Sequence, residues 1–391
     1  MGTFGQDRSP GYGMDLTLTD GQRAISRTAA EVLADCAATS GRRTAEGSDE
    51  WSRALWKQLA DLGWTALSVP ESYGGAGAGF LEACLVIEQL AAARVPSPYL
   101  LTVCAAEALR RFGTEQQLAA WLPEIAEGRP VGYVRAAADS VRGTGNSTID
   151  AIDHGSGILL SGTAEFVPFA EAVDTFIVVA GRPSGLTTFL VGPVRTGLDR
   201  SRMDVVGPDP YYRVRFDRVP VAGDTVLGRW DRGQEVLAVF EAFGAGAVCA
   251  EMIGGAQRVL DLTLDHARNR RQFARPIGSF QAVQHRCAAM AVDVLGARLL
   301  GYEAIWRLGT AGAESAETAL TVSAAKAWTG DAYRRVCDLG QQIHGAIGFT
   351  AEHELHLYLK HALSAAQAFG TPEAHADRIA DGIGLPRLRP Q

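Results

Sequence analysis

The amino-acid sequence predicts an α+β protein whose chain is divided into a helical part, a β part and a second helical part. Two observations carry this prediction. Apolar residues recur at three- and four-residue steps in the first and last thirds of the chain. The middle of the chain instead alternates short β-branched and aromatic runs with Gly, Pro, Thr and Asp. We predict an N-terminal helical domain over 15–128, a central β domain over 129–230 and a C-terminal helical domain over 231–391, after a disordered leader of residues 1–14.

One helix of the N-terminal part is expected to begin after Ser48. Serine is a favourable N-cap, and Asp49 and Glu50 would lie at the positive end of the helix dipole. Gly63 can end this helix. Its apolar stripe consists of Trp51, Leu55, Leu59 and Leu62. A further helix is expected over residues 81–93, after a turn-rich stretch.

The central part reads as a small antiparallel sheet. Residues 212–216, YRVRF, alternate apolar and basic side chains with a period of two, which is typical of a strand with one buried and one solvated face. Apolar runs at 157–160, 175–179 and 188–191 are separated by turn residues. These runs predict further strands of the same sheet.

The C-terminal part predicts long helices that pack as a bundle. Residues 244–257 are dense in Gly and Ala, which lets helix backbones approach closely, so we expect this segment to be buried among other helices. A later helix has one apolar face, formed by Phe280, Val283, Cys287, Met290, Val294 and Ala297.

The composition excludes several classes of protein. The 391-residue chain has a net charge of −7 and no basic block, so neither nucleic acid nor an anionic membrane surface is an expected partner. No uninterrupted apolar run has transmembrane length, and the N-terminus lacks the apolar core of a signal peptide. The six cysteines are scattered singly without a CxxC pair, which argues against a metal site or a disulfide framework and predicts a cytoplasmic protein.

Two segments contain residues suited to ligand chemistry. Residues 268–277, RNRRQFARPI, hold four arginines between two predicted helices, and guanidinium groups beside a helix N-terminus suit a pyrophosphate. Residues 341–350, QQIHGAIGFT, contain glycines that allow close backbone approach, and Gln342 can both donate and accept hydrogen bonds toward a heterocycle. Each segment alone is equally consistent with a solvated turn between helices.

Taken together, these segments resemble the acyl-CoA dehydrogenase family. The matching stretches are VPESYGGAGAG, FDRVPV followed by VLG, RRQFARPIGSFQAVQH and QQIHGAIGFTAEHELHLYLKHA, in the family's order and within residues 17–385. The resemblance implies a helical domain, a small β-barrel-like domain and a four-helix bundle. It also implies a non-covalent FAD, an oligomer, and α,β-desaturation of an acyl thioester of coenzyme A or of an acyl carrier protein. An electron-transfer flavoprotein is the family's common electron acceptor.

The resemblance assigns FAD contacts position by position. Arg270 matches the pyrophosphate arginine, and we expect it and the loop 342–346 to meet one FAD from two sides of a dimer interface. Phe166 would lie against the flavin ring, where Pro168 replaces a threonine and removes hydrogen-bonding groups. The remaining assigned residues are Phe273, Gln281, Gln342, Gly345 and Ala346, the last of which replaces a glycine of the family.

The catalytic base is missing from its usual positions. In the family, a carboxylate removes the α proton while the β hydrogen leaves as hydride to the flavin. Phe369 occupies one of the two positions that carry this carboxylate, and Gly244 occupies the other. Glu251 lies two helical turns beyond Gly244 on the same face and is a weak candidate, for which a structural ion pair with an arginine is the simpler interpretation. Other weak candidates are Asp139, His344 and Glu373.

Three functions therefore stay open. The first is a flavoprotein dehydrogenase whose base has moved. The second is a base-deficient subunit that assembles with a related acyl-CoA dehydrogenase chain. The third is a reuse of the fold for flavin-dependent monooxygenation or for binding without catalysis. A homo- or hetero-oligomer is expected, because the C-terminal helices carry more apolar surface than a lone bundle would bury.

Overall fold

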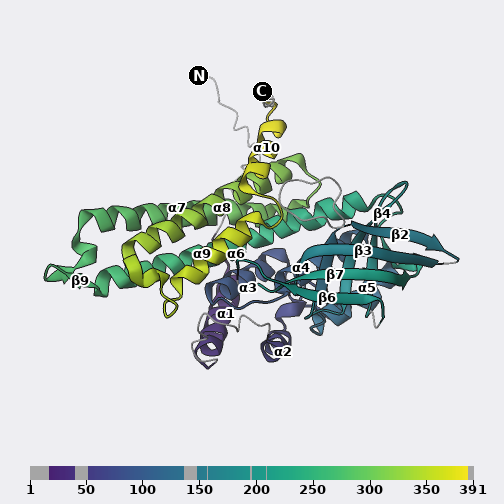
Figure 1. Cartoon of the computed structure of the whole chain (residues 1–391), viewed down its shortest axis with the longest axis horizontal. Coiled ribbons are helices and arrows are strands. Elements are labelled where there is room, and N and C mark those ends of the chain that lie inside the picture. The colour runs from purple at the N-terminus through teal and green to yellow at the C-terminus, as the bar shows by residue number, and fades with distance from the viewer. Residues whose placement is uncertain are drawn as a thin grey trace, which may run out of the picture.

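Three structural parts follow one another along the chain. The computed structural model describes residues 17–39, 52–135, 148–155, 157–193, 196–207 and 209–385. Figure 1 shows the long C-terminal helices side by side, with the sheet and the small hairpin at opposite ends of the molecule and the N-terminal helices along one flank. The expected leader and Asp139 lie outside the described residues.

In the part of the chain that the structure describes, five helices precede the sheet. Their bounds are α1 Asp20–Thr39, α2 Arg53–Asp61, α3 Phe80–Ala92, α4 Tyr99–Phe112 and α5 Glu115–Ala126. Short 3₁₀ turns, η1 Trp64–Ala66 and η2 Glu71–Tyr73, join α2 to α3.

The prediction that Ser48 caps the second helix was wrong. Helix α2 begins one turn later, where the Ser52 hydroxyl accepts a hydrogen bond from the Leu55 amide at 3.3 Å. Ser48 itself lies outside the described residues. A serine recurs four residues on, so the capping preference alone could not choose between the two. Gly63 follows the helix with a φ of 75°, as predicted for a residue that ends it.

Among the described residues, the central sheet has eight strands. They are β1 Val131–Arg135, β2 Thr148–His154, β3 Gly157–Pro168, β4 Thr175–Arg182, β5 Gly185–Val191, β6 Leu198–Met203, β7 Tyr211–Val221 and β8 Val226–Leu227. The order is β6-β7-β3-β2-β4-β5-β8, with β1 beside β4. In β7 the alternation predicted from the sequence is confirmed, because Tyr212, Val214 and Phe216 are buried while Arg213 and Arg215 are exposed.

The sheet is antiparallel apart from the contacts that β4 makes with β1 and β2. Strand β1 runs parallel to β4, with Val131 opposite Thr175, and a single parallel bridge joins β2 to β4. The expectation of a purely antiparallel sheet therefore needs this correction. Side-chain periodicity reports which face of a strand is buried, but not which strand lies beside it.

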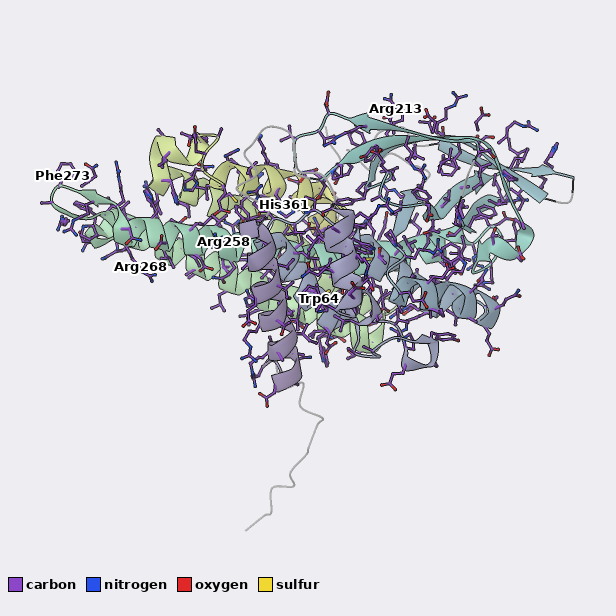
Figure 2. The ribbon with its side chains drawn as sticks, turned by 90° about the horizontal axis from the view of Figure 1, so that it is seen from below. Trp64, Arg213, Arg258, Arg268, Phe273 and His361 are labelled. Carbon is purple, nitrogen blue, oxygen red and sulfur yellow. The ribbon has the colours of Figure 1, made fainter. Side chains whose placement is uncertain are left out.

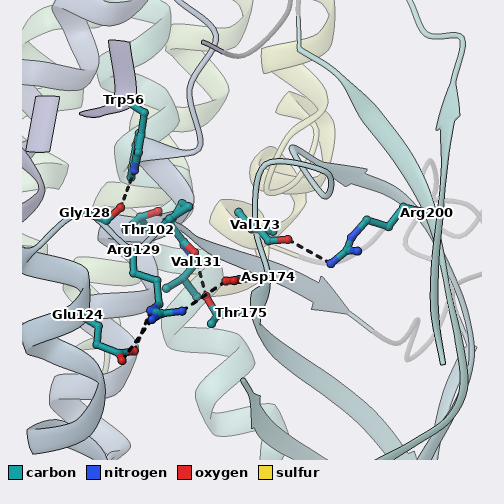
Figure 3. Close-up of polar contacts among 11 residues, drawn as sticks. Trp56, Thr102, Glu124, Gly128, Arg129, Val131, Val173, Asp174, Thr175 and Arg200 are labelled. Atoms are coloured by element: carbon teal, nitrogen blue, oxygen red, sulfur yellow. Dashed lines mark hydrogen bonds and ion pairs between the residues drawn. The ribbon is translucent and has the colours of Figure 1, made fainter. Parts of the chain in front are cut away.

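The junction between α5 and the sheet fixes the position of β1. Figure 3 shows the polar contacts there. The Trp56 indole donates to the Gly128 carbonyl at 2.6 Å, and the Val131 amide donates to the Thr102 hydroxyl at 3.1 Å. On the sheet side, the Thr175 hydroxyl donates to the Pro130 carbonyl at 2.9 Å. These bonds tie the first strand to both helical and sheet neighbours, so the side chains at its end are held in place.

The C-terminal part is built around a central buried helix, α6 Gly233–Asn269. Around it pack α7 Gln281–Ala311, α8 Ala316–His344 and α9 Leu355–Gln367, and α10 Pro372–Gly382 follows. A Cβ atom at Gly254 would lie 2.0 Å from the Glu88 carbonyl oxygen, so the close approach predicted from the small residues is confirmed. Helix α6 is long and apolar enough to cross a membrane, but 72% of its most apolar window is buried inside the fold, as in a core helix.

A two-residue hairpin closes the distant end of the bundle. Its strands are β9 Arg271–Gln272 and β10 Arg275–Pro276, which pair antiparallel. The turn residues Phe273 and Ala274 have φ values of 53° and 64°, the left-handed pair that a two-residue hairpin requires. The Phe273 side chain consequently points into solvent, with 87% of its surface exposed.

One hydrophobic core joins the first and third parts of the chain. It contains buried residues of α1, α3 and α4 together with those of α6 to α9. A second core lies inside the sheet domain. The buried Glu88 of α3 binds Arg298 of α7 at 2.8 Å and accepts a hydrogen bond from Tyr302, so a charged contact also links the two helical parts.

Candidate functional site

A cavity of about 540 Å³ lies where the three parts of the chain meet. Its walls come from α3 and α4, the end of β1, the β3 and β7 strands, α6, and α9 with the loop that follows it. Most of the lining side chains are apolar, and a few polar groups converge on the space. A cavity of this size and composition is typical of a site for a small organic ligand.

One face of α6 forms the long wall of the cavity. Leu237, Glu241, Val248 and Glu251 line it, at spacings of three, four and seven residues that place them on one side of the helix. Gly244 belongs to the same face of the helix, between Glu241 and Val248, and is buried. Side chains that the sequence separates by two turns therefore face one continuous space.

Phe369 covers Gly244. A Cβ atom at Gly244 would lie 2.2 Å from the Phe369 ring, so the glycine leaves the space that the ring fills. Phe369 has a φ of 56°, which turns its side chain toward α6, and its ring lies 6.5 Å from that of Phe240. The two positions expected to carry a base therefore face each other, and neither provides a carboxylate.

Two titratable side chains hold the loop that carries Phe369. The fully buried Lys326 donates to the carbonyl oxygens of Ala366 at 2.8 Å and Gly370 at 2.9 Å. His375 bonds through Nε2 to the Phe369 carbonyl oxygen at 3.0 Å. Burial lowers the pKa of Lys326 to about 8 and that of His375 to about 4. The backbone around Phe369 is thus fixed by groups outside the cavity wall.

Glu241 and Arg135 form an ion pair across the cavity, between α6 and the end of β1. Next to them Tyr133 stacks on Phe240 with ring centroids 3.9 Å apart. The Tyr133 hydroxyl is buried and has no hydrogen-bond partner among the described residues. Burial raises the pKa of Tyr133 well above its usual value, so this hydroxyl stays protonated and can donate to a ligand.

Glu251 is paired with a histidine, so the arginine partner that the simpler interpretation expected is wrong. Its Oε1 lies 3.1 Å from His361 Nε2, and His361 Nδ1 lies 3.1 Å from the Tyr333 hydroxyl. Burial alone would lower the pKa of His361, but the hydrogen bond and the charge of Glu251 outweigh it and raise the pKa. Glu251 and His361 both line the cavity.

The residues assigned to FAD fall into two groups. Phe166 lines the cavity, with a φ of 56° and 41% of its surface exposed. The others lie at the opposite end of the bundle, as Figure 2 shows for Phe273 relative to His361. All of this second group are exposed: Arg270, Phe273, Gln281, Gln342, Gly345 and Ala346.

That Arg270 and loop 342–346 meet one FAD from two sides of a dimer interface stays a prediction, and the structure adds how the two segments lie within one chain. The two segments lie at the same end of one chain, because the His266 ring, one turn before Arg270, stacks on the His344 ring at 4.3 Å. They form a single exposed surface, which we call the bundle-end surface, made of Arg270, Phe273, Gln281, Gln342, Gly345 and Ala346. Consecutive helices of the bundle run antiparallel, so α6 and α8 run in the same direction and their C-terminal ends lie side by side.

Two of the weaker base candidates, His344 and Glu373, lie outside the cavity wall. His344 is bound through Nδ1 to the Gly340 carbonyl oxygen at 2.9 Å, and burial lowers its pKa to about 4. Glu373 lies in the first turn of α10 and is exposed. Neither is among the residues that line the cavity.

Sequence reasoning missed Tyr133, Glu241 and His361. Glu241 could have been found, because it lies one turn before Gly244 on the same helix face. His361 is far from Glu251 in the sequence, and nothing in the local pattern of either segment connects them. Tyr133 and Arg135 reach the cavity only because β1 pairs with β4, which periodicity did not indicate.

Comparison with known proteins matches both helical parts of the chain. Residues 19–129 match the family model "Acyl-CoA dehydrogenase, N-terminal domain" and residues 231–384 match "Acyl-CoA dehydrogenase, C-terminal domain". The chain is 30% identical to acyl-CoA dehydrogenase FadE27 of Mycobacterium tuberculosis, over 94% of this chain and 98% of the relative. It is 31% identical to acyl-CoA dehydrogenase IpdE2 of the same organism, over 93% and 98% of the two chains.

The fold also matches solved structures. A chain of the ChsE4–ChsE5 complex of Mycobacterium tuberculosis superposes with a TM-score of 0.84 at 28% identity, covering 96% of this chain and all of that one. The matches extend through the central sheet, which neither family model includes. The predicted order of helical domain, β domain and helical bundle is therefore confirmed.

Proposed function

Because the chain belongs to the acyl-CoA dehydrogenase family, we propose that its cavity takes the acyl part of a thioester for FAD-dependent α,β-desaturation. The observation that supports this most directly is the cavity at the junction of the three parts, on whose wall Phe369 lies with its ring against Gly244. Coenzyme A or an acyl carrier protein would carry the acyl group, and an electron-transfer flavoprotein would accept the electrons.

The residues present fit a flavin cofactor in two places. Phe166 and the unpartnered Tyr133 hydroxyl offer a ring face and a donor in the cavity. On the bundle-end surface, the Arg270 side chain forms no ion pair or hydrogen bond with a described residue, and Phe273 is exposed beside it. FAD, when bound, supplies the acceptor for the hydride that leaves the β carbon. We assign Phe166 to the flavin ring of the FAD bound in the same chain. We assign Arg270 to the pyrophosphate of the FAD bound in a neighbouring chain.

Arg270→Ala is expected to weaken FAD retention by roughly 10- to 100-fold, because a guanidinium–phosphate pair is a charge-assisted contact. The measurement is the ratio of FAD to protein after gel filtration, together with the dissociation constant from flavin fluorescence. Arg268→Ala is the matched control, since Arg268 is exposed two residues earlier and its loss changes the charge equally. Equal flavin loss in both variants would contradict the assignment.

A second candidate function is a base-deficient subunit within a hetero-oligomer. The specific observation in its favour is that the Phe369 ring fills the space above Gly244, so both usual base positions are closed to a carboxylate. The related ChsE4–ChsE5 structure is a complex of two differently named chains. Affinity purification from the native host tests this idea. Recovery of a second family member with a glutamate at the position of Phe369 would favour it, and recovery of this chain alone would count against it.

An exposed apolar face on α7 supports an oligomer. Val292, Leu295 and Leu299 recur at three- and four-residue steps and are 66%, 56% and 47% exposed. Gly296 lies in the same stretch, where a Cβ atom would meet Trp328 of α8 at 2.9 Å. A helix face that exposes this many large apolar side chains is typical of a subunit interface.

Leu295→Glu is expected to weaken self-association, or association with a related chain, at least about 10-fold, because it places a charge in an apolar interface. Sedimentation velocity across a dilution series measures the effect. Ile152→Glu is the control, since Ile152 is a similarly exposed apolar residue on β2, 54% exposed and remote from α7. An unchanged dissociation constant in Leu295→Glu would exclude this face as the interface.

A further inference from the structure

Part of the cavity wall carries a cluster of three hydrogen-bonded polar residues. Glu251 of α6 accepts a hydrogen bond from His361 of α9 at 3.1 Å, and His361 is in turn bonded to the Tyr333 hydroxyl of α8 at 3.1 Å. His361 and Tyr333 are buried, whereas the Glu251 side chain is 23% exposed, on the cavity wall. We call these three residues the distal cluster.

The distal cluster is separated from the expected reaction position. Glu251 follows Gly244 by two helical turns on the same face of α6, which corresponds to about 10 Å along the helix axis at 1.5 Å per residue. Between them on this face lies the apolar Val248, and Leu90, Val95 and Leu100 also line the cavity. A group bound at the distal cluster would therefore belong to the part of the acyl chain remote from the thioester.

The geometry leaves the Glu251 carboxylate available to a ligand. His361 engages only Oε1, and no hydrogen bond from a described residue occupies Oε2. Turning a carboxylate toward an apolar cavity is unfavourable unless a donor satisfies it. His361 fixes the orientation of the Glu251 carboxylate, and Tyr333 fixes the orientation of His361. The carboxylate on the cavity wall is therefore a preformed acceptor.

The surrounding charges favour a neutral donor over a cation. Glu251 already faces the His361 imidazole, and Arg94 adds positive charge near that ring, while Asp209 adds a negative one. A second positive group on the ligand would compete with the imidazole for the same carboxylate. A hydroxyl group needs only one acceptor and brings no charge into the cavity.

We propose that the distal cluster is a recognition subsite for a hydroxyl group on the acyl part, remote from the thioester, with Glu251 as its acceptor. This inference rests on the proposed function, because it assumes that the acyl group enters this cavity. It makes Glu251 a specificity-determining residue, whereas the family positions 244 and 369 concern proton removal. The substrate class is therefore a hydroxylated acyl thioester.

Binding of two thioesters of equal chain length tests the proposal. Octanoyl-CoA and 8-hydroxyoctanoyl-CoA are titrated by calorimetry into the purified protein, with its partner chain where one co-purifies, and without an electron acceptor. The hydroxylated ligand should bind roughly 10-fold more tightly, as expected for a hydrogen bond to a charged acceptor. Glu251→Gln should remove most of this preference and leave the octanoyl-CoA dissociation constant within about 2-fold.

Glu165→Gln is the matched control. Glu165 also lines the cavity but is engaged by Arg213 at 2.8 Å, so its variant should keep the preference of the unaltered protein. Equal affinity of the unaltered protein for both thioesters would overturn the subsite while leaving the proposed function intact. Binding of neither thioester would overturn the proposed binding of a coenzyme A thioester in this cavity, and the subsite with it. A preference that is undiminished in Glu251→Gln would show that the charged acceptor contributes nothing, and would overturn the subsite.

Discussion

Replacing Phe369 by Glu should raise the rate of α,β-desaturation by roughly 10²- to 10⁴-fold, the range that a positioned general base typically contributes. The physical reason is the space above Gly244, which the Phe369 ring fills and a smaller glutamate side chain can enter. The backbone at position 369 stays held by Lys326 and His375, so the new carboxylate would be directed into the cavity. The assay uses FAD-saturated protein, a straight-chain acyl-CoA and an artificial electron acceptor.

Gly244→Glu is not an equivalent route to the same activity. Its Cβ atom would lie 2.2 Å from the Phe369 ring, so the single change should disrupt packing and lower the yield of folded protein. Combined with Phe369→Ala, the same glutamate gains the vacated space. The double variant should therefore be folded and more active than the unaltered protein.

The control for the first prediction is Phe369→Gln, which has the shape of glutamate without its basicity. If Phe369→Glu is no faster than Phe369→Gln, proton removal does not take place in this cavity, and the base-deficient subunit becomes the better description. Fast desaturation by the unaltered protein alone would show that a carboxylate such as Glu241 or Glu251 already serves as the base.

A second large effect is expected from pH. His375 is almost fully buried, with 1% of its surface exposed, and burial lowers its pKa to about 4 from an ordinary 6.5. Arg378 and Lys326 add positive charge nearby and act in the same direction. The unfolded chain therefore binds a proton at this residue at a higher pH than the folded chain does. This residue should make the free energy of unfolding fall by about 3 kcal/mol as the pH drops from 6.5 to 4.

Urea unfolding at pH 7 and at pH 4 measures the effect. His375→Gln keeps a side-chain donor toward the Phe369 carbonyl oxygen but cannot titrate, so its stability should fall less over the same interval, by about that amount. His154→Gln is the control, because His154 is exposed on β2. The same pH dependence in His375→Gln and the unaltered protein would contradict the prediction.

The fold was largely predictable because its elements carry strong local patterns. The alternation in β7 and the small residues of α6 identified a half-solvated strand and a buried helix before any contact was known. The start of α2 was not predictable to the residue, since Ser48 and Ser52 satisfy the same capping rule. Pairing of β1 with β4 was not predictable either, because side-chain alternation contains no information about which strand is adjacent.

Only those residues of the candidate site that lie on one helix could be related to each other from the sequence. Gly244 and Glu251 share a face of α6, and helical geometry alone relates them. Their partners Phe369 and His361 come from segments more than 100 residues away, and contact with them depends on how α9 crosses α6. The family resemblance proposed the position of Phe369, but it contained nothing about His361 or the Glu241–Arg135 pair, which belong to this chain's own packing.

The core shared by the first and third parts of the chain has a consequence for synthesis on the ribosome. Helices α3 and α4 bury their apolar faces against α6, which ends about 140 residues after α5 does. At a translation rate of about 5–20 residues per second, synthesis from the end of α5 to the end of α6 takes roughly 7–28 s, and the apolar faces of α3 and α4 stay uncovered for that time. During this interval the nascent chain exposes the apolar side chains of a finished domain with no partner to bury them. The yield of folded protein therefore depends on whether α6 is synthesised before the exposed faces aggregate. Slow codons before residue 269 would increase aggregation, and a chaperone at the exit tunnel would reduce it.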